Sequence, residues 1–293
     1  MKEMKGDFAL TIDFDRNAAN PERVFTAMAE MITSFKLIDK SLIHSIDNKI
    51  QPVIMLEDVE SGSMIVWLKQ LIVQADDDAL KNLDWKPLIG QYLVKSKYII
   101  LNFLEKKTRI TDALEVKNLQ KELYELAEKT NVRKFPAYTP VSIPNLISGL
   151  DKLNKSLKDL DKNDTVSFKS TEGNASFNLD FEFNSTEIED LLTKESLENK
   201  STLILKVKKP DYIGTSQWEF KHDKKSISAK ILDEDWLLEF QQRKKDVRPG
   251  DSLKSEVEIS VKYGYDMNVI SSSYEIVKVL AIIRDENANP NLF

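Results

Sequence analysis

The sequence predicts an α+β protein with a helix-rich N-terminal domain that contains few strands and a β-rich C-terminal domain, built as a mostly antiparallel sheet or barrel. Two observations support this prediction. Before Asp161, several long stretches repeat apolar residues at helical spacing, and after it the apolar period becomes two, as in half-buried strands. The chain of 293 residues is also long enough for about two domains of roughly 100 to 200 residues each.

The N-terminal elements begin with a strand and a long helix. Apolar and polar residues alternate over Phe8–Phe14, which predicts a half-buried strand. A helix is predicted to begin at Asn20-Pro21, with asparagine as the N-cap and proline in the first helical position. Gln51–Asp58 is predicted to be a short buried strand. Met64–Ala75 is apolar on nearly all sides, so a helix and a strand both fit this segment.

Three further helix signals follow. Asp76–Asp78 is typical of a helix N-terminus, because carboxylates there interact favourably with the helix dipole. Trp85–Glu105 carries apolar residues at helical spacing, and Thr111-Asp112 opens another amphipathic segment.

Prolines mark the predicted domain boundary. Pro136, Pro140 and Pro144 recur at intervals of four without apolar periodicity, and proline withholds the amide donor that regular structure needs. Leucines from Leu146 to Leu160 then repeat in a heptad-like pattern, which predicts a connector helix packed on its own domain, with a dimer seam as the alternative. The expected organisation is therefore a helix-rich domain over 1–130, a linker and connector helix over 131–162, a β-rich domain over 163–285 and a frayed tail over 286–293.

The C-terminal part shows strand periodicity and turn signals. Residues 175–183 alternate cleanly and predict a strand, and Thr186 with Glu189 fits a capping box for a short helix. Between Lys200 and Ile283 the pattern predicts a series of strands interrupted by a helix that begins near Asp233. Pro249-Gly250 matches the central pair of a type II turn.

Composition limits the chemistry that the chain can perform. It contains no cysteine, which removes thiolate catalysis and cysteine zinc sites, and only two histidines. The polar N-terminus predicts no signal peptide, and charges interrupt the most apolar region, Val53–Val73. We therefore expect a cytoplasmic protein that is not inserted in a membrane, has no metal site or cofactor and is not clearly an enzyme. The net charge of −6 argues against a dedicated non-specific DNA-binding protein.

One short segment nevertheless resembles the motif of the PD-(D/E)xK nucleases. Pro210-Asp211 is followed by Glu219-Phe220-Lys221. The resemblance implies that Asp211 and Glu219 bind Mg²⁺ and that Lys221 helps to activate the attacking water. It covers about a dozen residues, a length at which chance matches are common. An exposed hairpin with one polar face accounts for the same spacing of Glu219 and Lys221.

Positive charge is concentrated in the same region. The candidate binding residues for an anionic partner are Lys208, Lys209, Lys244, Lys245 and Arg248. Their simplest interpretation is a solvated basic rim, and the alternative is a nucleic-acid-binding patch.

A second resemblance concerns the general character of the sequence. Pro52–Trp67, Trp85–Leu93 and Ile227–Phe240 followed by Arg248-Pro249-Gly250-Asp251 resemble uncharacterised bacterial proteins from mobile-element and anti-phage defence neighbourhoods. The resemblance implies an accessory or sensor protein and supplies no catalytic residue.

The sequence thus favours a non-catalytic interaction or recognition protein that binds another protein or a second copy of itself. A metal-dependent nuclease and a nucleic-acid-binding module are the alternatives.

Overall fold

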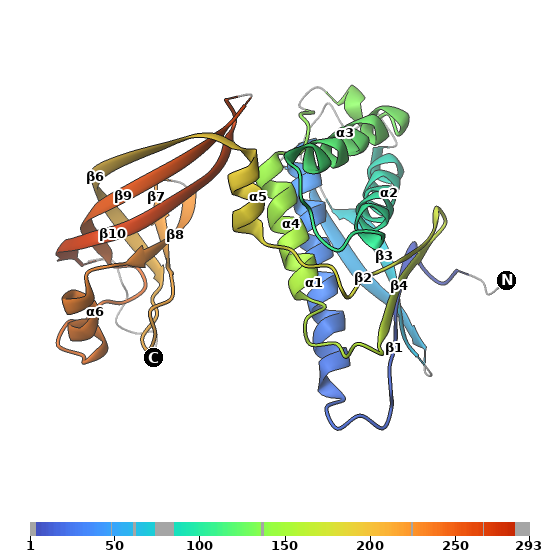
Figure 1. Cartoon of the computed structure of the whole chain (residues 1–293), viewed down its shortest axis with the longest axis horizontal. Coiled ribbons are helices and arrows are strands. Elements are labelled where there is room, and N and C mark those ends of the chain that lie inside the picture. Colours follow the sequence, from blue (N-terminus) through green and yellow to red (C-terminus); the bar gives the residue numbers. More distant parts are fainter. Residues whose placement is uncertain are drawn as a thin grey trace. The chain divides into compact units, whose positions relative to one another are not determined.

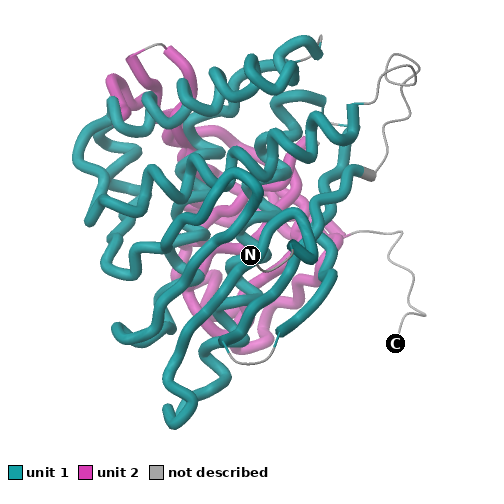
Figure 2. Tube along the Cα trace, turned by 90° about the vertical axis from the view of Figure 1, so that its right-hand side faces the viewer, with its two compact units in different colours: residues 1–191 teal, residues 192–293 magenta. Residues whose placement is uncertain are grey.

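The computed structural model describes residues 4–47, 49–60, 63–73, 85–135, 138–223, 225–265 and 267–284. It confirms an α+β chain with two separate sheets. The chain divides into two compact units, residues 1–191 and residues 192–293 (Figure 2). Across the described ranges, no helix is both long and apolar enough to cross a membrane.

Unit 1 combines a five-stranded antiparallel sheet with helices (Figure 1). Its elements in chain order are β1 (Phe8–Asp13), α1 (Glu22–His44), β2 (Gln51–Glu60), β3 (Met64–Val73), α2 (Trp85–Glu105), α3 (Ala113–Lys129), the 3-10 turn η2 (Val132–Lys134), α4 (Ile143–Lys155), β4 (Thr165–Ser170), β5 (Gly173–Ser176) and α5 (Ser185–Leu192). The strand order is β2-β3-β1-β4-β5, so the first strand of the chain is the central strand of the sheet.

The core of unit 1 lies between this sheet and the helices α1 and α2. The rings of Phe8 in β1, Phe35 in α1 and Phe168 in β4 contact one another, with centroids 5.4 to 6.1 Å apart. Helix α1 packs against α4, where a Cβ on Gly149 would lie 2.8 Å from the Ile38 side chain. Glycine at this position therefore permits the close approach of the two helices.

Two buried ion pairs also hold unit 1 together. Arg23 at the start of α1 donates two hydrogen bonds to Asp164, at 3.2 and 3.0 Å. Lys97 of α2 is fully buried and donates to Asp39 of α1 and, at 3.0 Å, to Gln70 of β3. The second pair connects both core helices to the sheet.

The predicted linker does not separate the two units. Strands β4 and β5 fall in the predicted β-rich domain, yet β4 pairs with β1 from Phe8↔Ser170 to Asp13↔Thr165. This pairing spans most of unit 1 in sequence, and no local pattern reveals it. Pro144, which we assigned to the linker, lies in the first turn of α4, where a missing N–H costs nothing.

Several local predictions are settled by the structure. Met64–Val73 is a strand, and α1 begins one residue later than expected, with Pro21 as its N-cap. The predicted strand 175–183 is wrong beyond Ser176. There the Asn178 side chain accepts from the amide of Asp180 and donates to Lys107 O, which bends the chain out of the ladder.

Two other predictions differ in detail or cannot be compared. Helix α5 is capped by Asn184, which accepts from the amides of Thr186 and Glu187, rather than by a Thr186 capping box. The Asp76–Asp78 helix start and the tail 286–293 lie outside the described residues.

In its described residues, unit 2 is a closed five-stranded barrel with one helix. Its elements are β6 (Thr193–Lys209), β7 (Trp218–His222), β8 (Lys225–Ile231), α6 (Glu234–Gln241), β9 (Ser252–Gly264) and β10 (Val269–Ile283). The order around the barrel is β10-β8-β7-β6-β9, and β9 and β10 pair to close it. All pairs are antiparallel except β8 with β10.

Aromatic side chains fill the barrel. Trp218 of β7, only 1% exposed, lies 4.8 Å from Phe240 and 6.0 Å from Trp236 of α6, measured between ring centroids. Asp233 caps α6 by accepting from the amide of Trp236, and its other oxygen accepts from Val279 N in β10. The helix is therefore attached to the barrel through its aromatic face and through its N-cap.

Candidate functional site

The loop between β6 and β7 is organised by one carboxylate, that of Asp211. It accepts hydrogen bonds from the Ser216 hydroxyl at 2.5 Å and from the amides of Ile213, Gly214 and Ser216 at 2.9 to 3.1 Å. The Ser216 hydroxyl, followed by these amides, holds the pKa of Asp211 well below its ordinary value. A Cβ on Gly214 would lie 2.8 Å from the carboxylate, so a larger residue there would require the Asp211 side chain to shift.

Glu219 and Lys221, the other two residues of the nuclease-like segment, lie side by side on the outer face of β7. Trp218 and Phe220 alternate with them and point into the barrel. Glu219 lies 3.8 Å from Lys208, whereas the Asp211 carboxylate is directed into its own loop. Across the described residues, no three histidine or acidic side chains form a group that could hold a metal ion. The structure thus brings Glu219 and Lys221 together and gives Asp211 a different environment.

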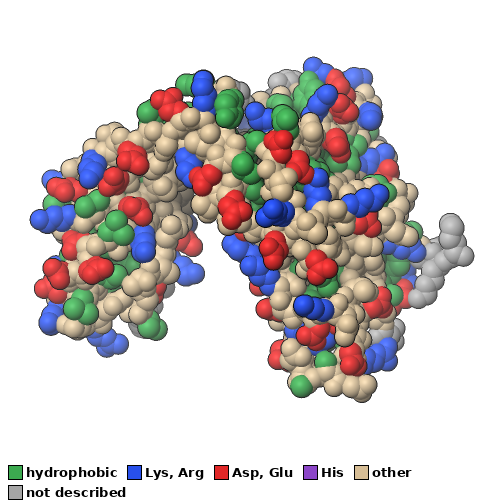
Figure 3. Space-filling model, viewed as in Figure 1, with side chains coloured by type: hydrophobic (Ala, Val, Ile, Leu, Met, Phe, Trp, Pro, Cys, Tyr) green, Lys and Arg blue, Asp and Glu red, His purple; other side chains and the backbone are tan. Residues whose placement is uncertain are grey.

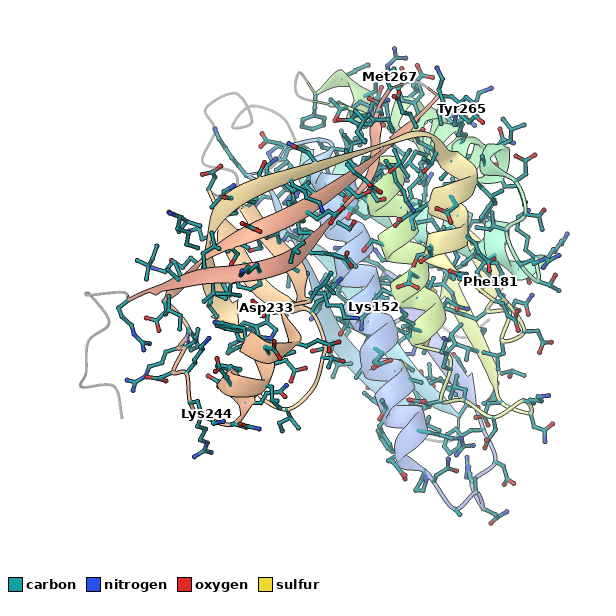
Figure 4. All side chains as sticks on the ribbon, turned by 60° about the vertical axis from the view of Figure 1, so that its left-hand side comes forward. Lys152, Phe181, Asp233, Lys244, Tyr265 and Met267 are labelled. Carbon is teal, nitrogen blue, oxygen red and sulfur yellow. The ribbon has the colours of Figure 1, made fainter. Side chains whose placement is uncertain are left out.

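The predicted basic residues gather at the end of the barrel where this loop lies. Lys208 and Lys209 end β6, and Lys244 and Lys245 follow α6, whose end is marked by Lys244 in Figure 4. The loop joins these two groups, because Gln241 Nε2 of α6 donates to Gly214 O at 2.7 Å. Arg248 lies at the same end of the barrel, because Gly250, two residues further along the chain, donates its N–H to Val207 O of β6.

Three of these five basic side chains are neutralised by acidic neighbours. Lys208 contacts Glu219 and also donates to Ser226 Oγ at 3.0 Å. Lys245 lies 2.6 Å from Glu239, and Arg248 lies 3.1 Å from Asp246. Figure 3 shows this intermixing of basic and acidic side chains over the visible face of unit 2. Lys209 and Lys244 are exposed, and they are the cations of the set best placed to meet an anion.

Two exposed side chains at this end were missed by the sequence analysis. Tyr212 is 55% exposed and its ring stacks on Phe240, with centroids 5.3 Å apart. Ile213 is 92% exposed. The available signal was the Asp-Tyr-Ile-Gly-Thr-Ser run, because aspartate followed by glycine and serine is typical of a side-chain-bonded turn.

The outer face of the barrel next to this loop is basic and polar. Lys206 of β6 pairs across strands with Lys221 of β7, which pairs with Ser226 of β8. Beyond them, Ser228 and Lys230 are exposed on β8. This three-stranded face and the Asp211 loop adjoin each other.

The connectivity of unit 2 defines its class. Numbered within the unit, the strands run 1-2-3-5-4 and back to 1, the helix lies between strands 3 and 4, and strands 3 and 5 are parallel. This is the topology of the OB-type Greek-key barrel, whose strands 2 and 3 and connecting loops form a ligand-binding face in many proteins. A fold of this kind does not by itself assign a function.

Comparisons with protein-family models, with curated proteins and with solved structures found no match to this chain.

Proposed function

We propose that the chain is a non-catalytic recognition protein whose unit 2 barrel binds single-stranded nucleic acid. The observation that carries this proposal is that exposed lysines, Lys209 at the end of β6 and Lys244 after α6, and the exposed Tyr212 ring lie at one end of an OB-type barrel. Lysines contact phosphates, and an exposed aromatic ring stacks on a base. These are the two contacts that single-strand binding by such barrels requires.

The loop favours a single strand over a duplex. Its backbone is fixed by three amide hydrogen bonds to the Asp211 carboxylate, and the Ser216 hydroxyl donates a fourth. The Tyr212 ring stacks on Phe240. A ring held in this way loses little conformational entropy when it binds. Bases in a duplex are already stacked on each other, so Tyr212 can accept only a base that is unstacked.

Charge predicts a modest, salt-sensitive affinity. The chain carries a net charge of −6, and acidic partners neutralise Lys208, Lys245 and Arg248. Few phosphates are therefore contacted, and most of the selectivity for a single strand comes from stacking.

The test is fluorescence anisotropy with labelled single-stranded DNA and RNA, and with a duplex of the same sequence, over a range of salt concentrations. We expect Lys209→Ala combined with Lys244→Ala to weaken binding and to lower the salt slope for a single strand by about 1.4, which is about 0.7 for each lost phosphate contact. Lys278→Ala, which removes an exposed lysine on β10, is the matched control. Binding that ignores salt, or that falls equally in the control, would contradict the proposal.

Tyr212 is tested in the same assay. Tyr212→Ala is expected to weaken single-strand binding by about tenfold while leaving the salt slope unchanged, because stacking carries no charge. Tyr212→Phe keeps the ring and is expected to bind like the unmodified chain. Equal affinity of the alanine variant would show that the loop does not contact a base.

A further inference from the structure

The sheet of unit 1 has an open position in its centre. The central strand β1 pairs with β3 only from Phe8↔Leu68 to Ile12↔Met64. Strand β3 continues to Val73 and pairs with β2 over that whole length. Within the described part of the chain, no strand pairs with residues 69–73 of β3 on the side where β1 has ended.

The chain before β1 leaves this position open because it turns away at Gly6. A Cβ there would lie 2.7 Å from Leu68 O, so only glycine allows so close an approach. Lys5 then contacts Asp58 and Glu60 of β2, which places it over the neighbouring strand. The described residues that precede β1 therefore do not continue the ladder beside β3.

The backbone of β3 directs hydrogen-bonding groups into the open position. Ile72 lies opposite Pro52, which has no N–H, so this pair is a non-hydrogen-bonded one. The N–H and C=O of Ile72 consequently point away from β2. Gln70 has the same orientation, because its N–H donates to the Asp7 carboxylate at 2.8 Å. The Asp7 carboxylate stands where the carbonyl of a paired strand would lie.

A cavity of about 780 Å³ occupies this position. Its walls are residues 69–72 of β3, the turn residues Thr171 and Glu172 after β4, and one side of α2. On that side Gly90 faces Gln70 O, with a built Cβ at 3.9 Å, so α2 leaves space beside the strand. We call this cavity the β3 slot.

The contents of the β3 slot define the chemistry of its ligand. Lys69 and Lys86 line it: Lys69 is paired with Glu57 at 3.5 Å, and the exposed Lys86 has its Nζ 5.9 Å from the centroid of the Trp85 ring. Glu172, also in the lining, is paired with Lys95 at 3.4 Å. Along the β3 edge, the main-chain groups directed into the slot are the N–H of Ile72 and the carbonyls of Gln70 and Ile72. One donor and two acceptors in a row along a strand edge match the main chain of an extended peptide.

We propose that the β3 slot binds an extended segment of a partner protein, which adds a strand antiparallel to β3 in line with β1. The peptide residue opposite Ile72 exchanges both main-chain hydrogen bonds with it and directs its side chain toward α2. This site is separate from the barrel of unit 2 and does not depend on nucleic-acid binding. The sequence predicted an interaction with another protein. This proposal places that interaction in the β3 slot and assigns it to strand addition.

The test uses short peptides selected from a displayed library against the full chain and then synthesised with blocked ends. Their affinity is measured by fluorescence polarisation for the unmodified chain, for Gly90→Leu and for Asn102→Leu. The leucine at position 90 improves helix propensity and fills the β3 slot, whereas Asn102 is an exposed residue of α2 outside the slot. We expect at least about tenfold weaker binding to Gly90→Leu and unchanged binding to Asn102→Leu.

An N-methylation scan distinguishes strand addition from binding through side chains alone. N-methylation of the peptide removes one N–H at a time, and we expect large losses only at alternate positions, where the N–H faces β3. Failure to select any peptide that distinguishes the unmodified chain from Gly90→Leu overturns the proposal. A methylation scan without alternation also overturns it, because the peptide would then bind through side chains alone.

Discussion

The two units solve the problem of a stable interior in different ways. Unit 1 buries charge: Lys97 and Asp39 are both fully inaccessible, and Arg23 with Asp164 is nearly so. Both units bury aromatic rings, but the ion pairs around the Asp211 loop of unit 2 lie at the surface. A buried charge destabilises the fold unless an opposite charge lies beside it. Buried aromatic rings stabilise the fold only where their shapes pack closely together. The two units should therefore respond differently to pH and to truncation of side chains.

The largest effect is expected from Trp218→Ala in the barrel. The substitution removes a ring that contacts Phe220, Trp236 and Phe240 and leaves a cavity, at a cost of about 3–5 kcal/mol. Chemical denaturation should show an early loss of unit 2. Limited proteolysis should leave a fragment close to residues 1–191, and loss of both units together would show that their stabilities are coupled.

Lys97→Met tests the charged core of unit 1. It leaves Asp39 buried without its cation, and we expect a loss of about 3 kcal/mol near neutral pH. Burial raises the pKa of Asp39, so its protonated form favours the folded state and this contribution is lost as the pH rises through the folded-state pKa. The variant should accordingly gain stability as the pH is lowered through the folded-state pKa of Asp39.

The comparison for Lys97→Met is the double variant with Asp39→Leu, measured by urea denaturation. An apolar pair of similar volume should recover much of the loss and remove its pH dependence. A single variant as stable as the unmodified chain at every pH would contradict the idea of a matched buried pair.

The helix caps give the smallest effects and a direct comparison between units. Asp112→Ala removes the capping box of α3 in unit 1, where Asp112 and Glu115 bond each other's backbone, and should cost about 1 kcal/mol. Asp233→Ala removes a cap that also bonds Val279 of β10, and should cost about 2 kcal/mol. Thermal denaturation of both variants checks the order, and an equal loss would show that the bond to β10 contributes nothing.

Sequence patterns correctly predicted the helices, because their periodicity and caps involve residues close together in the sequence. Helix α2 has the bounds Trp85–Glu105 expected from its periodicity, and α6 begins at Glu234, next to the expected start near Asp233. Strand β6 begins at Thr193, before the predicted strand series from Lys200 onward, because its polar first half is held by pairing from Thr193↔Gly264 onward. Pairing between distant segments leaves no local trace, and the same limitation concealed the division at residue 191.

The sequence identified the basic residues of the candidate site but not how they are arranged or paired. Its basic residues could be identified from charge density, and they meet at one end of the barrel. Which of them are neutralised depends on acidic neighbours such as Glu219, brought close to Lys208 by strand pairing. Tyr212 was overlooked because exposure is a property of the folded loop.

The way Asp211 holds its loop has a consequence for how this surface can change over evolutionary time. Three of its four hydrogen bonds go to main-chain amides and the fourth to Ser216, so none depends on the side chains at positions 212 and 213. Substitutions at these two positions alter what the loop presents without disturbing the scaffold beneath it. Related chains can therefore diverge in ligand preference there while Asp211, Gly214 and Ser216 remain under constraint.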